Sequence, residues 1–355
     1  MKYGLPYKGS KNKLAERIVR LMPKRTHLMD LFCGGCAVSH AAMVMGKYKH
    51  IHINDINWMC PTLFIDAING KYNNESRWIS REDFFRLKDT DPYVAVVWSF
   101  GNNMRDYLYS REIEPLKKAI HYALFFSDYS LAKELGHDLS FIDPIKDLQK
   151  RYMAVKHYFN QFGHFRKQSF EGGAKRVAQI AVNGKTNVPQ SCSTWNVSTE
   201  CRNSKKKNPA MWGNGKPRTK ERTCMPWRAT NGREGCGNVL RGGYSVPITS
   251  SVLDYQDVEI PKDSVIYCDI PYLNSNVYNK AEHFDYERFY EWCGRQAEPV
   301  FISSYQMPED RFDCIEEFVH RSTLCATANN QVTERIFVPK HQSERGNKRV
   351  QLSLF

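Results

Sequence analysis

The feature that most constrains this chain is a short apolar run that ends abruptly in an acid, a proline and an aromatic. Residues 265–268 are all apolar, and Asp269, Ile270, Pro271 and Tyr272 follow. An unbroken apolar run of this length, with punctuation at its carboxyl end, is typical of a buried parallel strand. In open α/β sheets, ligands bind at the carboxyl ends of the strands. The pattern therefore predicts an α/β fold with Asp269 and Tyr272 in a ligand crevice.

Near the amino terminus, the sequence predicts a strand, a glycine turn and a helix, which together begin a βαβ unit. Residues 28–32 are an apolar strand that contains Asp30, and the turn at 33–36 includes Gly34. A helix is expected over about 37–45. Glycines let a backbone approach a nucleotide closely, and the start of a helix offers free N–H groups. The turn lacks the G-x-G-x-x-G pattern, which argues against a dehydrogenase.

The next expected strand, residues 50–55, ends in Asp55. An acid about 20 residues after the glycines of such a unit hydrogen-bonds the ribose hydroxyls of a nucleotide. Asp55 could instead cap a helix that starts near Asn57, and the two roles are compatible.

A long insert separates this unit from the acid-proline-aromatic corner, and residues 61–187 of it are mainly helical. The expected helices cover residues 62–69, 81–88, 112–126 and 145–165. Residues 94–100 fit either a strand or a buried helical turn. The turn that follows carries Asn103 and Arg105, residue types that can read base edges. A turn without any ligand role is the alternative.

The rest of the insert, residues 188–245, is rich in Gly, Asn, Ser, Thr and Pro. Within 201–245, eleven Lys and Arg face two Glu, a local charge of +9, whereas the whole chain carries +13. Lys205, Lys206 and Lys207 stand together. Such a basic, aromatic-containing and poorly periodic stretch can follow phosphates and become ordered on binding. A solvated linker is the alternative.

After residue 246 the α/β pattern returns. A strand-like run over 248–255 ends in Asp254 and Tyr255, and a helix capped by Asp285 is expected over 285–296. The further strands are expected over 299–305, in a hairpin of 319–327 and 334–338, and at 350–354. We therefore expect one sheet assembled from residues 1–60 and 246–355, interrupted by the insert.

Length and charge are consistent with this layout. The chain has 355 residues, enough for about two domains, and a pI of about 9.1 that suits a polyanionic partner such as nucleic acid. It contains no apolar run of the ~18 to 20 residues that span a bilayer and no apolar signal region at its start. We expect a soluble, cytoplasmic protein of a bacterial or phage setting that does not bind membranes.

The eleven cysteines are an odd number without paired spacing, which favours reduced thiols over a disulfide scaffold. Four of them lie in the basic part of the insert, at irregular intervals without a C-x-x-C pattern. These four are Cys192, Cys201, Cys224 and Cys236. We expect no metal site.

Taken in order, these motifs resemble the Dam-type, or alpha-class, DNA adenine-N6 methyltransferases. That family has an amino-terminal cofactor motif, a D-x-F-x-G-G loop, a target-recognition insert and a D-P-P-Y corner. The corresponding residues are Tyr7-Lys8-Gly9-Ser10-Lys11, Asp30-Leu31-Phe32-Cys33-Gly34-Gly35 and Asp269-Ile270-Pro271-Tyr272. The resemblance implies a Rossmann-like sheet that binds S-adenosylmethionine (SAM), a long helical and irregular insert, and double-stranded DNA as substrate.

The resemblance also implies roles for individual residues. Asp269 and the carbonyl of Ile270 would accept the N–H groups of a flipped-out adenine, and Tyr272, after Pro271, would stack on the base. Asp55 would bind the ribose of SAM. The other implied SAM contacts are Tyr7, Lys11, Asp30, Phe32, Gly34, Asp254, Tyr255 and Asp269. Asn103, Arg105, Lys205, Lys206 and Lys207 are the candidate DNA contacts.

One position departs from the family pattern, because Ile270 replaces the first proline. Proline restricts the backbone of the residue before it, so its loss relaxes the backbone at Asp269. We expect activity to survive. A degenerate DNA-binding homologue, an N4-cytosine enzyme and an RNA methyltransferase remain as alternatives. The sequence leaves open the recognition site and whether a restriction endonuclease is a partner, and we expect a monomer.

Overall fold

The computed structural model describes residues 2–160, 177, 180, 246–272, 284–321 and 331–343. In this part of the chain, a seven-stranded sheet has the order β3-β2-β1-β4-β5-β7-β6. The strands are β1 (His27–Asp30), β2 (His50–Asn54), β3 (Ile248–Ser251), β4 (Ser264–Asp269), β5 (Val300–Ser304), β6 (Phe312–Arg321) and β7 (Gln331–Pro339). The first five in this order pair in parallel, whereas β7 runs antiparallel to both β5 and β6. The predicted α/β fold is confirmed.

Strand β4 is apolar on both faces because each face meets its own layer of helices. Val265 and Tyr267 belong to the core on one side, and Ile266 and Cys268 to the core on the other. This alternation explains the unbroken apolar run in the sequence.

Helices cover both faces of the sheet. Helices α1 (Ala15–Leu21), α2 (Ala37–Met45) and α3 (Met59–Ile68) contribute to the core that contains Val265. Helix α10 (Tyr286–Arg295) packs on the opposite face. The Asp285 carboxylate caps α10 by accepting a hydrogen bond from the Arg288 backbone N–H (2.9 Å). The predicted helix and its cap are both confirmed.

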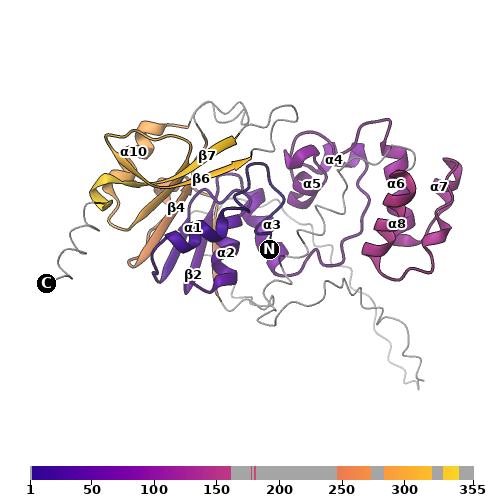
Figure 1. Ribbon diagram of the computed structural model, residues 1–355, viewed down its shortest axis with the longest axis horizontal. Coiled ribbons are helices and arrows are strands. Elements are labelled where there is room, and N and C mark those ends of the chain that lie inside the picture. Colours follow the sequence, from indigo (N-terminus) through magenta and orange to yellow (C-terminus); the bar gives the residue numbers. More distant parts are fainter. Residues whose placement is uncertain are drawn as a thin grey trace, which may run out of the picture.

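The helical part of the chain begins next to the sheet and extends away from it (Figure 1). It comprises α4 (Arg81–Leu87), α5 (Pro92–Val97), α6 (Glu114–Phe126), α7 (Ser130–Glu134) and α8 (Leu148–Asn160). Buried residues of α5 join the core of the sheet, whereas those of α6 to α8 form a separate core. Of the two interpretations of residues 94–100, helix is correct over its first part. Pro92 begins α5, and Asp91 caps it by accepting from the N–H groups of Tyr93 and Val94.

The two terminal strands form the predicted hairpin, although β6 begins at Phe312, earlier than the sequence indicated. The expected strand at 350–354 lies outside the described residues. The basic segment 188–245 and its four cysteines lie outside them as well. In the part of the chain that the structure describes, no helix has both the length and the apolar character to cross a bilayer.

The strand order creates a switch point between β1 and β4. From β1 the chain proceeds outward through β2 and β3, and then returns to β4 on the opposite side of β1. Ligands of open α/β sheets bind at such a switch point, outside the carboxyl ends of the strands. The carboxyl ends of β1 and β4 are Asp30 and Asp269.

Candidate active site

The switch point brings together acids from three strands. Asp30 ends β1, Asp269 ends β4, and Asp55 directly follows β2. The strands β1 and β4 are in register, with Asp30 opposite Tyr267. The negative charges of Asp269 and Asp55 both act on Asp30. The first constraint drawn from the sequence, an acid at a strand end, therefore belongs to a larger acidic site.

Lys11 is the cation of this site and comes from the loop before α1. Its Nζ lies 2.7 Å from Oδ1 of Asp269 and 3.1 Å from Oε1 of Glu334, a residue of β7. The side chains of Lys11 and Glu334 are 7% and 5% exposed. These three residues, the Lys11–Asp269–Glu334 cluster, carry two negative charges and one positive charge in a largely buried position.

Burial and neighbouring charges shift the pKa of each partner. Burial raises the pKa of Asp269 to about 6, the Lys11 ammonium opposes this rise, and Glu334 adds to it. Burial lowers the pKa of Lys11, but the two carboxylates outweigh it and hold the pKa above its ordinary value. Lys11 therefore remains charged, and Asp269 is mainly ionised at neutral pH.

Tyr272 turns its hydroxyl into the same cluster. The hydroxyl donates to Oε1 of Glu334 (2.8 Å) and lies 3.4 Å from Oδ1 of Asp269. The ring centroid lies 4.2 Å from that of Tyr305, and Nζ of Lys11 lies 4.9 Å from it. Tyr272 is thus oriented by contacts from three other segments of the chain.

The glycine turn is the place where the amino-terminal loop meets the sheet. Gly34 has a φ of +45°, and a Cβ atom at Gly35 would lie 2.7 Å from Cβ of Tyr7. The Leu5 backbone N–H donates to the Gly35 carbonyl (2.7 Å). Glycine is needed here because the loop carrying Tyr7 packs directly on the turn. The sequence indicated close approach of a ligand, and the structure shows close approach of the chain itself.

Asp55 ties the turn to the end of β2. Its Oδ2 accepts the Gly34 N–H (2.8 Å), and its Oδ1 accepts the Asn57 N–H (2.9 Å). The capping role considered in the sequence is therefore present, and the same carboxylate also fixes the glycine turn. Burial raises the pKa of Asp55.

Asp30 is buried with only one of its oxygens hydrogen-bonded. Oδ2 accepts from the Ser39 hydroxyl (2.6 Å), whereas Oδ1 has no hydrogen-bond partner among the described residues. Burial, opposed by Ser39, raises the pKa of Asp30 to about 7. A buried carboxylate oxygen without a donor favours a ligand that supplies a positive charge or a donor.

The other residues expected at the cofactor lie along the neighbouring strand ends. The ring of Phe32, which follows β1, lies 5.3 Å from that of Tyr255. Tyr255 is buried against α10. Asp254 caps the turn η3 (Tyr255–Asp257) by accepting from the Gln256 N–H, and it pairs with Arg288.

Ile270, the departure from the family pattern, is 2% exposed and packs in the core on the α10 face. Its apolar side chain therefore fills the volume that this corner requires. The Pro271 carbonyl accepts a hydrogen bond from the Tyr286 hydroxyl (3.0 Å), so the corner is also tied to α10.

The candidate DNA contacts in the helical part, Asn103 and Arg105, interact with each other and with the neighbouring Asp106. Oδ1 of Asn103 accepts from the N–H groups of Arg105 and Asp106, and the Arg105 side chain pairs with Asp106 at 2.8 Å. Arg105 is 70% exposed, so this pair is accessible to solvent. Lys205, Lys206 and Lys207 lie outside the described residues.

Sequence reasoning missed Glu334 and Tyr305. Tyr305 directly follows β5, and its position as the last residue of the strand predicted over 299–305 was a usable signal. Glu334 stands at the start of a predicted hairpin strand, and nothing local distinguishes it from a surface acid. Only the insertion of β7 beside β5 brings it toward the Lys11 loop.

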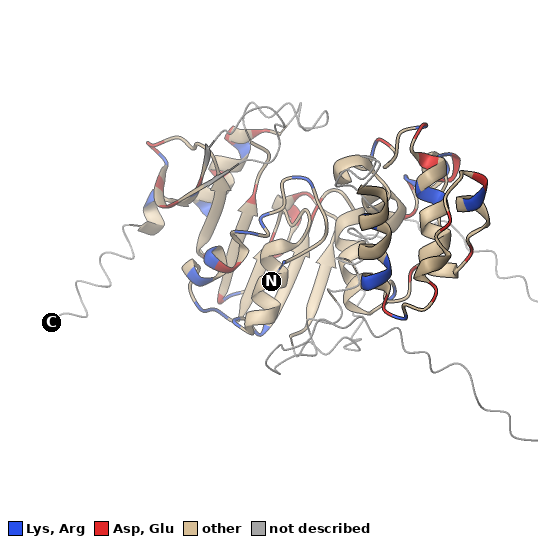
Figure 2. Cartoon of the chain, turned by 45° about the vertical axis from the view of Figure 1, so that its right-hand side comes forward, with Lys and Arg blue, Asp and Glu red and all other residues tan. Residues whose placement is uncertain are grey.

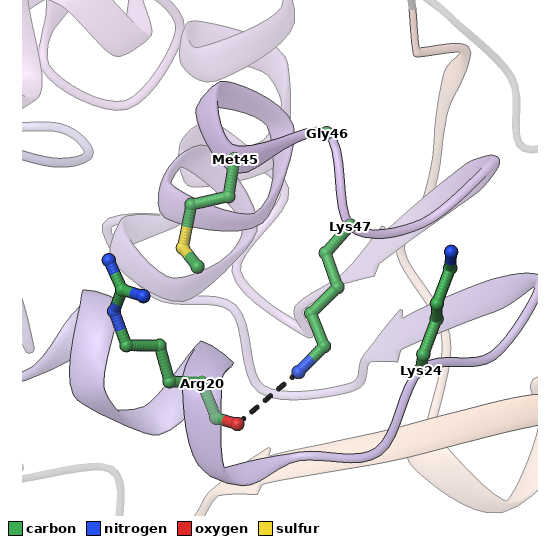
Figure 3. Close-up of a pocket in the computed structure, with 5 residues that line it drawn as sticks. All are labelled: Arg20, Lys24, Met45, Gly46 and Lys47. Atoms are coloured by element: carbon green, nitrogen blue, oxygen red, sulfur yellow. Dashed lines mark hydrogen bonds between the residues drawn. The ribbon is translucent and has the colours of Figure 1, made fainter.

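A separate basic depression lies where α1 and α2 end, on the amino-terminal side of β1 and β2 (Figure 3). Its lining residues are Arg20, Lys24, Met45, Gly46 and Lys47. The Lys47 ammonium donates to the backbone carbonyls of Val19, Arg20 and Met22. This lysine therefore ties down the end of α1 and lies away from the acidic switch point.

The sheet order and the acidic switch point are those of a Rossmann-like methyltransferase. Residues 7–167 match the family model described as D12 class N6 adenine-specific DNA methyltransferase. The protein is therefore an enzyme that methylates the N6 amine of adenine in DNA, and the family implies SAM as the methyl donor. The family match decides against the alternatives of an N4-cytosine methyltransferase and an RNA methyltransferase. No curated protein sequence matches the chain.

Proposed function

We propose that the methyl group is transferred to a flipped-out adenine held by Asp269 at the switch point of the sheet. The observation that carries this proposal is the state of the Asp269 carboxylate. Lys11 and Tyr272 both contact Oδ1, and Oδ2 receives no hydrogen bond from the described residues. One oxygen is thus fixed by the protein, and the other is free to accept an N–H group of the target.

The chemistry explains why an acid is needed. The lone pair of the adenine N6 amine is delocalised into the ring, so the amine is a poor nucleophile. Asp269 and the backbone carbonyl of Ile270 would accept its two N–H groups and draw the nitrogen toward a tetrahedral geometry. SAM, when bound, supplies a methyl group activated by a sulfonium. The protein then contributes mainly positioning and electrostatic stabilisation.

Tyr272 is the proposed stacking partner of the base. An adenine inside a duplex cannot reach a buried carboxylate, so the base must leave the helix. Glu334 and Tyr305 already hold the Tyr272 ring in place, and a ring held before binding loses little conformational entropy when a base stacks on it.

The residues around the switch point fit a cationic cofactor. Asp30, Asp55, Asp269 and Glu334 outnumber Lys11, and Oδ1 of Asp30 has no partner in the described part of the chain. SAM carries positive charge on both its sulfonium and its amine. The proposed SAM-binding residues are Tyr7, Lys11, Asp30, Phe32, Gly34, Asp55, Asp254, Tyr255 and Asp269.

Duplex binding is proposed for the insert. Acidic and basic residues are mixed over the described helical part (Figure 2), whereas 201–245 carries a net +9. We therefore assign non-specific phosphate binding to this basic segment, including Lys205, Lys206 and Lys207. Asn103 and Arg105 are the proposed base contacts in the described helical part. We assign residues 1–60 and 246–355 to catalysis and 61–187 to target recognition.

The proposed role of Asp269 is tested by Asp269→Ala. We expect transfer to adenine to be lost, while DNA binding stays within about twofold because the basic segment is intact. Nucleoside mass spectrometry of DNA from cells expressing each protein would measure N6-methyladenine, and fluorescence anisotropy would measure duplex binding. Turnover by the variant at the wild-type rate would refute the assignment.

A further inference from the structure

We propose that Glu334 is a positioning residue that holds Lys11 and Tyr272 on one oxygen of Asp269 and so keeps the other oxygen free for the target amine. The inference rests on the proposed role of Asp269. It assigns a function in methyl transfer to the antiparallel strand β7, which carries no motif of the resemblance.

The geometry of Glu334 links three segments at a single atom. Its Oε1 lies 3.1 Å from Nζ of Lys11 and accepts the Tyr272 hydroxyl at 2.8 Å. Lys11 belongs to the amino-terminal loop and Tyr272 follows β4, so Glu334 joins the two ends of the chain at the site. Without it, the Lys11 ammonium and the Tyr272 hydroxyl would each lose a carboxylate partner and keep their contact with Asp269.

Glu334 occupies a buried position, where an apolar side chain would cost less free energy to bury than a carboxylate. It is 4% exposed, opposite Phe318 in the β6–β7 register, and Ile336 on the same strand is fully buried. A buried carboxylate is tolerated only when it is paired and hydrogen-bonded. Its partner Lys11 is already paired with Asp269, so Glu334 adds a second negative charge that the ion pair alone does not need. A stability role alone does not explain this charge.

The two carboxylate oxygens of Asp269 have different contacts. Lys11 (2.7 Å) and Tyr272 (3.4 Å) both lie at Oδ1. Glu334 draws both donors toward β7, and within the described residues Oδ2 is left without a donor. If Lys11 were free to bridge both oxygens, the carboxylate would be a weaker acceptor for the amine. Glu334 therefore determines which oxygen meets the substrate.

The arrangement has a consequence for pH dependence, because Glu334 and Lys11 act on Asp269 in opposite directions. Glu334 raises the pKa of Asp269 and Lys11 lowers it. The other ionisable groups that act on or face Asp269 are Asp30, Tyr267, Cys268, Tyr272 and Tyr305. Burial raises the pKa of each of these, so the tyrosines and the cysteine stay neutral near pH 6. After burial, Lys11 and Glu334 are the largest influences on the pKa of Asp269, so removing the charge of Glu334 should move the acid limb of the rate profile.

The test replaces Glu334 by glutamine, which keeps the shape but removes the charge, in the full chain. We expect kcat for duplex methylation to fall by about tenfold to 10²-fold, the usual effect of a small displacement of a catalytic group. KM for DNA should change less than about twofold. The acid limb of the kcat–pH profile should move to lower pH, because the charge that raises the pKa of Asp269 is gone. Glu334→Asp keeps the charge at a shorter reach, so it should lower kcat without moving the limb.

Glu317→Gln is the matched control. It removes a carboxylate from the same hairpin, but this carboxylate pairs with Arg335 and is 55% exposed. Its kcat and its pH profile should equal those of the wild type. Thermal unfolding of each variant checks the fold. If Glu334→Gln does not unfold cooperatively, the kcat of Glu334→Asp decides whether the inference holds.

Two results would overturn the inference. One is a Glu334→Gln variant with kcat within twofold of wild type and an unmoved acid limb. The other is a Glu334→Asp variant of wild-type kcat. If Asp269→Ala is inactive in the same assay, either result contradicts the role of Glu334 alone. If Asp269→Ala is active, the proposed function fails as well.

Discussion

Replacing Lys11 with methionine tests the electrostatic account of the site most directly. Methionine has a similar length and keeps the apolar packing, but it leaves Asp269 and Glu334 facing a buried position without a cation. Nζ of Lys11 lies 2.7 Å and 3.1 Å from these carboxylates. Removing one partner of a buried ion pair destabilises a protein by about 3–5 kcal/mol, because a buried charge is left uncompensated.

The size of this loss should depend on pH. In the wild type, the folded pKa of Asp269 is about 6, above the ordinary 3.8. The stability linked to this raised pKa is therefore present below 3.8 and is lost as the pH rises through about 6. Without the Lys11 ammonium the folded pKa rises further, and the variant binds a proton at a pH where the wild type is ionised.

The magnitude follows from the linkage of proton binding and stability. A tenfold change in proton affinity corresponds to about 1.4 kcal/mol, so a loss of about 3–5 kcal/mol implies that the pKa of Asp269 in the variant lies well above its wild-type value of about 6. The deficit of Lys11→Met relative to wild type then grows between pH 6 and pH 8 and reaches about 3 kcal/mol at pH 8. Toward pH 5.5, where Asp269 is increasingly protonated in both proteins, the part of the deficit that comes from Asp269 should shrink.

Urea unfolding followed by tryptophan fluorescence at pH 5.5 and pH 8 measures this difference. Lys47→Met is the matched control, because its ammonium donates to the carbonyls of Val19, Arg20 and Met22 and not to a carboxylate. Its deficit should be the same at both pH values. A Lys11→Met deficit that does not change between them would refute the charge reasoning, whatever its size.

Three further outcomes are expected. Ile270→Pro should leave the methylation rate unchanged or raised, since the buried corner stays apolar, and a steady-state assay showing collapse of the rate would contradict this. Gly35→Ala places a Cβ 2.7 Å from Cβ of Tyr7, so calorimetry should find weaker SAM binding and about 1–3 kcal/mol lower stability. Gly294→Ala, with open space around it, should change SAM binding little. Deleting 201–240 should flatten the salt dependence of duplex binding in anisotropy titrations, and an unchanged slope would identify a linker.

The sequence predicts the sheet well because its strands carry their own signals. Apolar residues on both faces identify β4, and the capping Asp285 identifies the start of α10. Residues 94–100 remained ambiguous because a short apolar run fits a strand or a buried helix equally. The Asp91 cap and Pro92 at the helix start decide for α5.

The candidate site is only partly predictable. Motif order predicts Lys11, Asp30 and Asp269 as site residues one at a time, and the structure adds the ion pair between Lys11 and Asp269. Glu334 was missed because its role comes from the sheet order. The antiparallel placement of β7 between β5 and β6 depends on contacts between distant parts of the chain. The sequence of β7 alone does not predict this placement.

The acidic surplus of the site has a physical meaning that the single motifs do not express. Around one ammonium, the switch point gathers the carboxylates of Asp30, Asp55, Asp269 and Glu334. Burial raises the pKa of Asp269 to about 6 and that of Asp30 to about 7, so both are near the boundary between neutral and ionised forms at physiological pH. A site of this kind binds a cationic group more tightly than a neutral one of the same shape, because the cation keeps these carboxylates ionised. The charge distribution thus favours a sulfonium donor over its neutral thioether product, and it includes Asp269, the carboxylate that we propose orients the target amine.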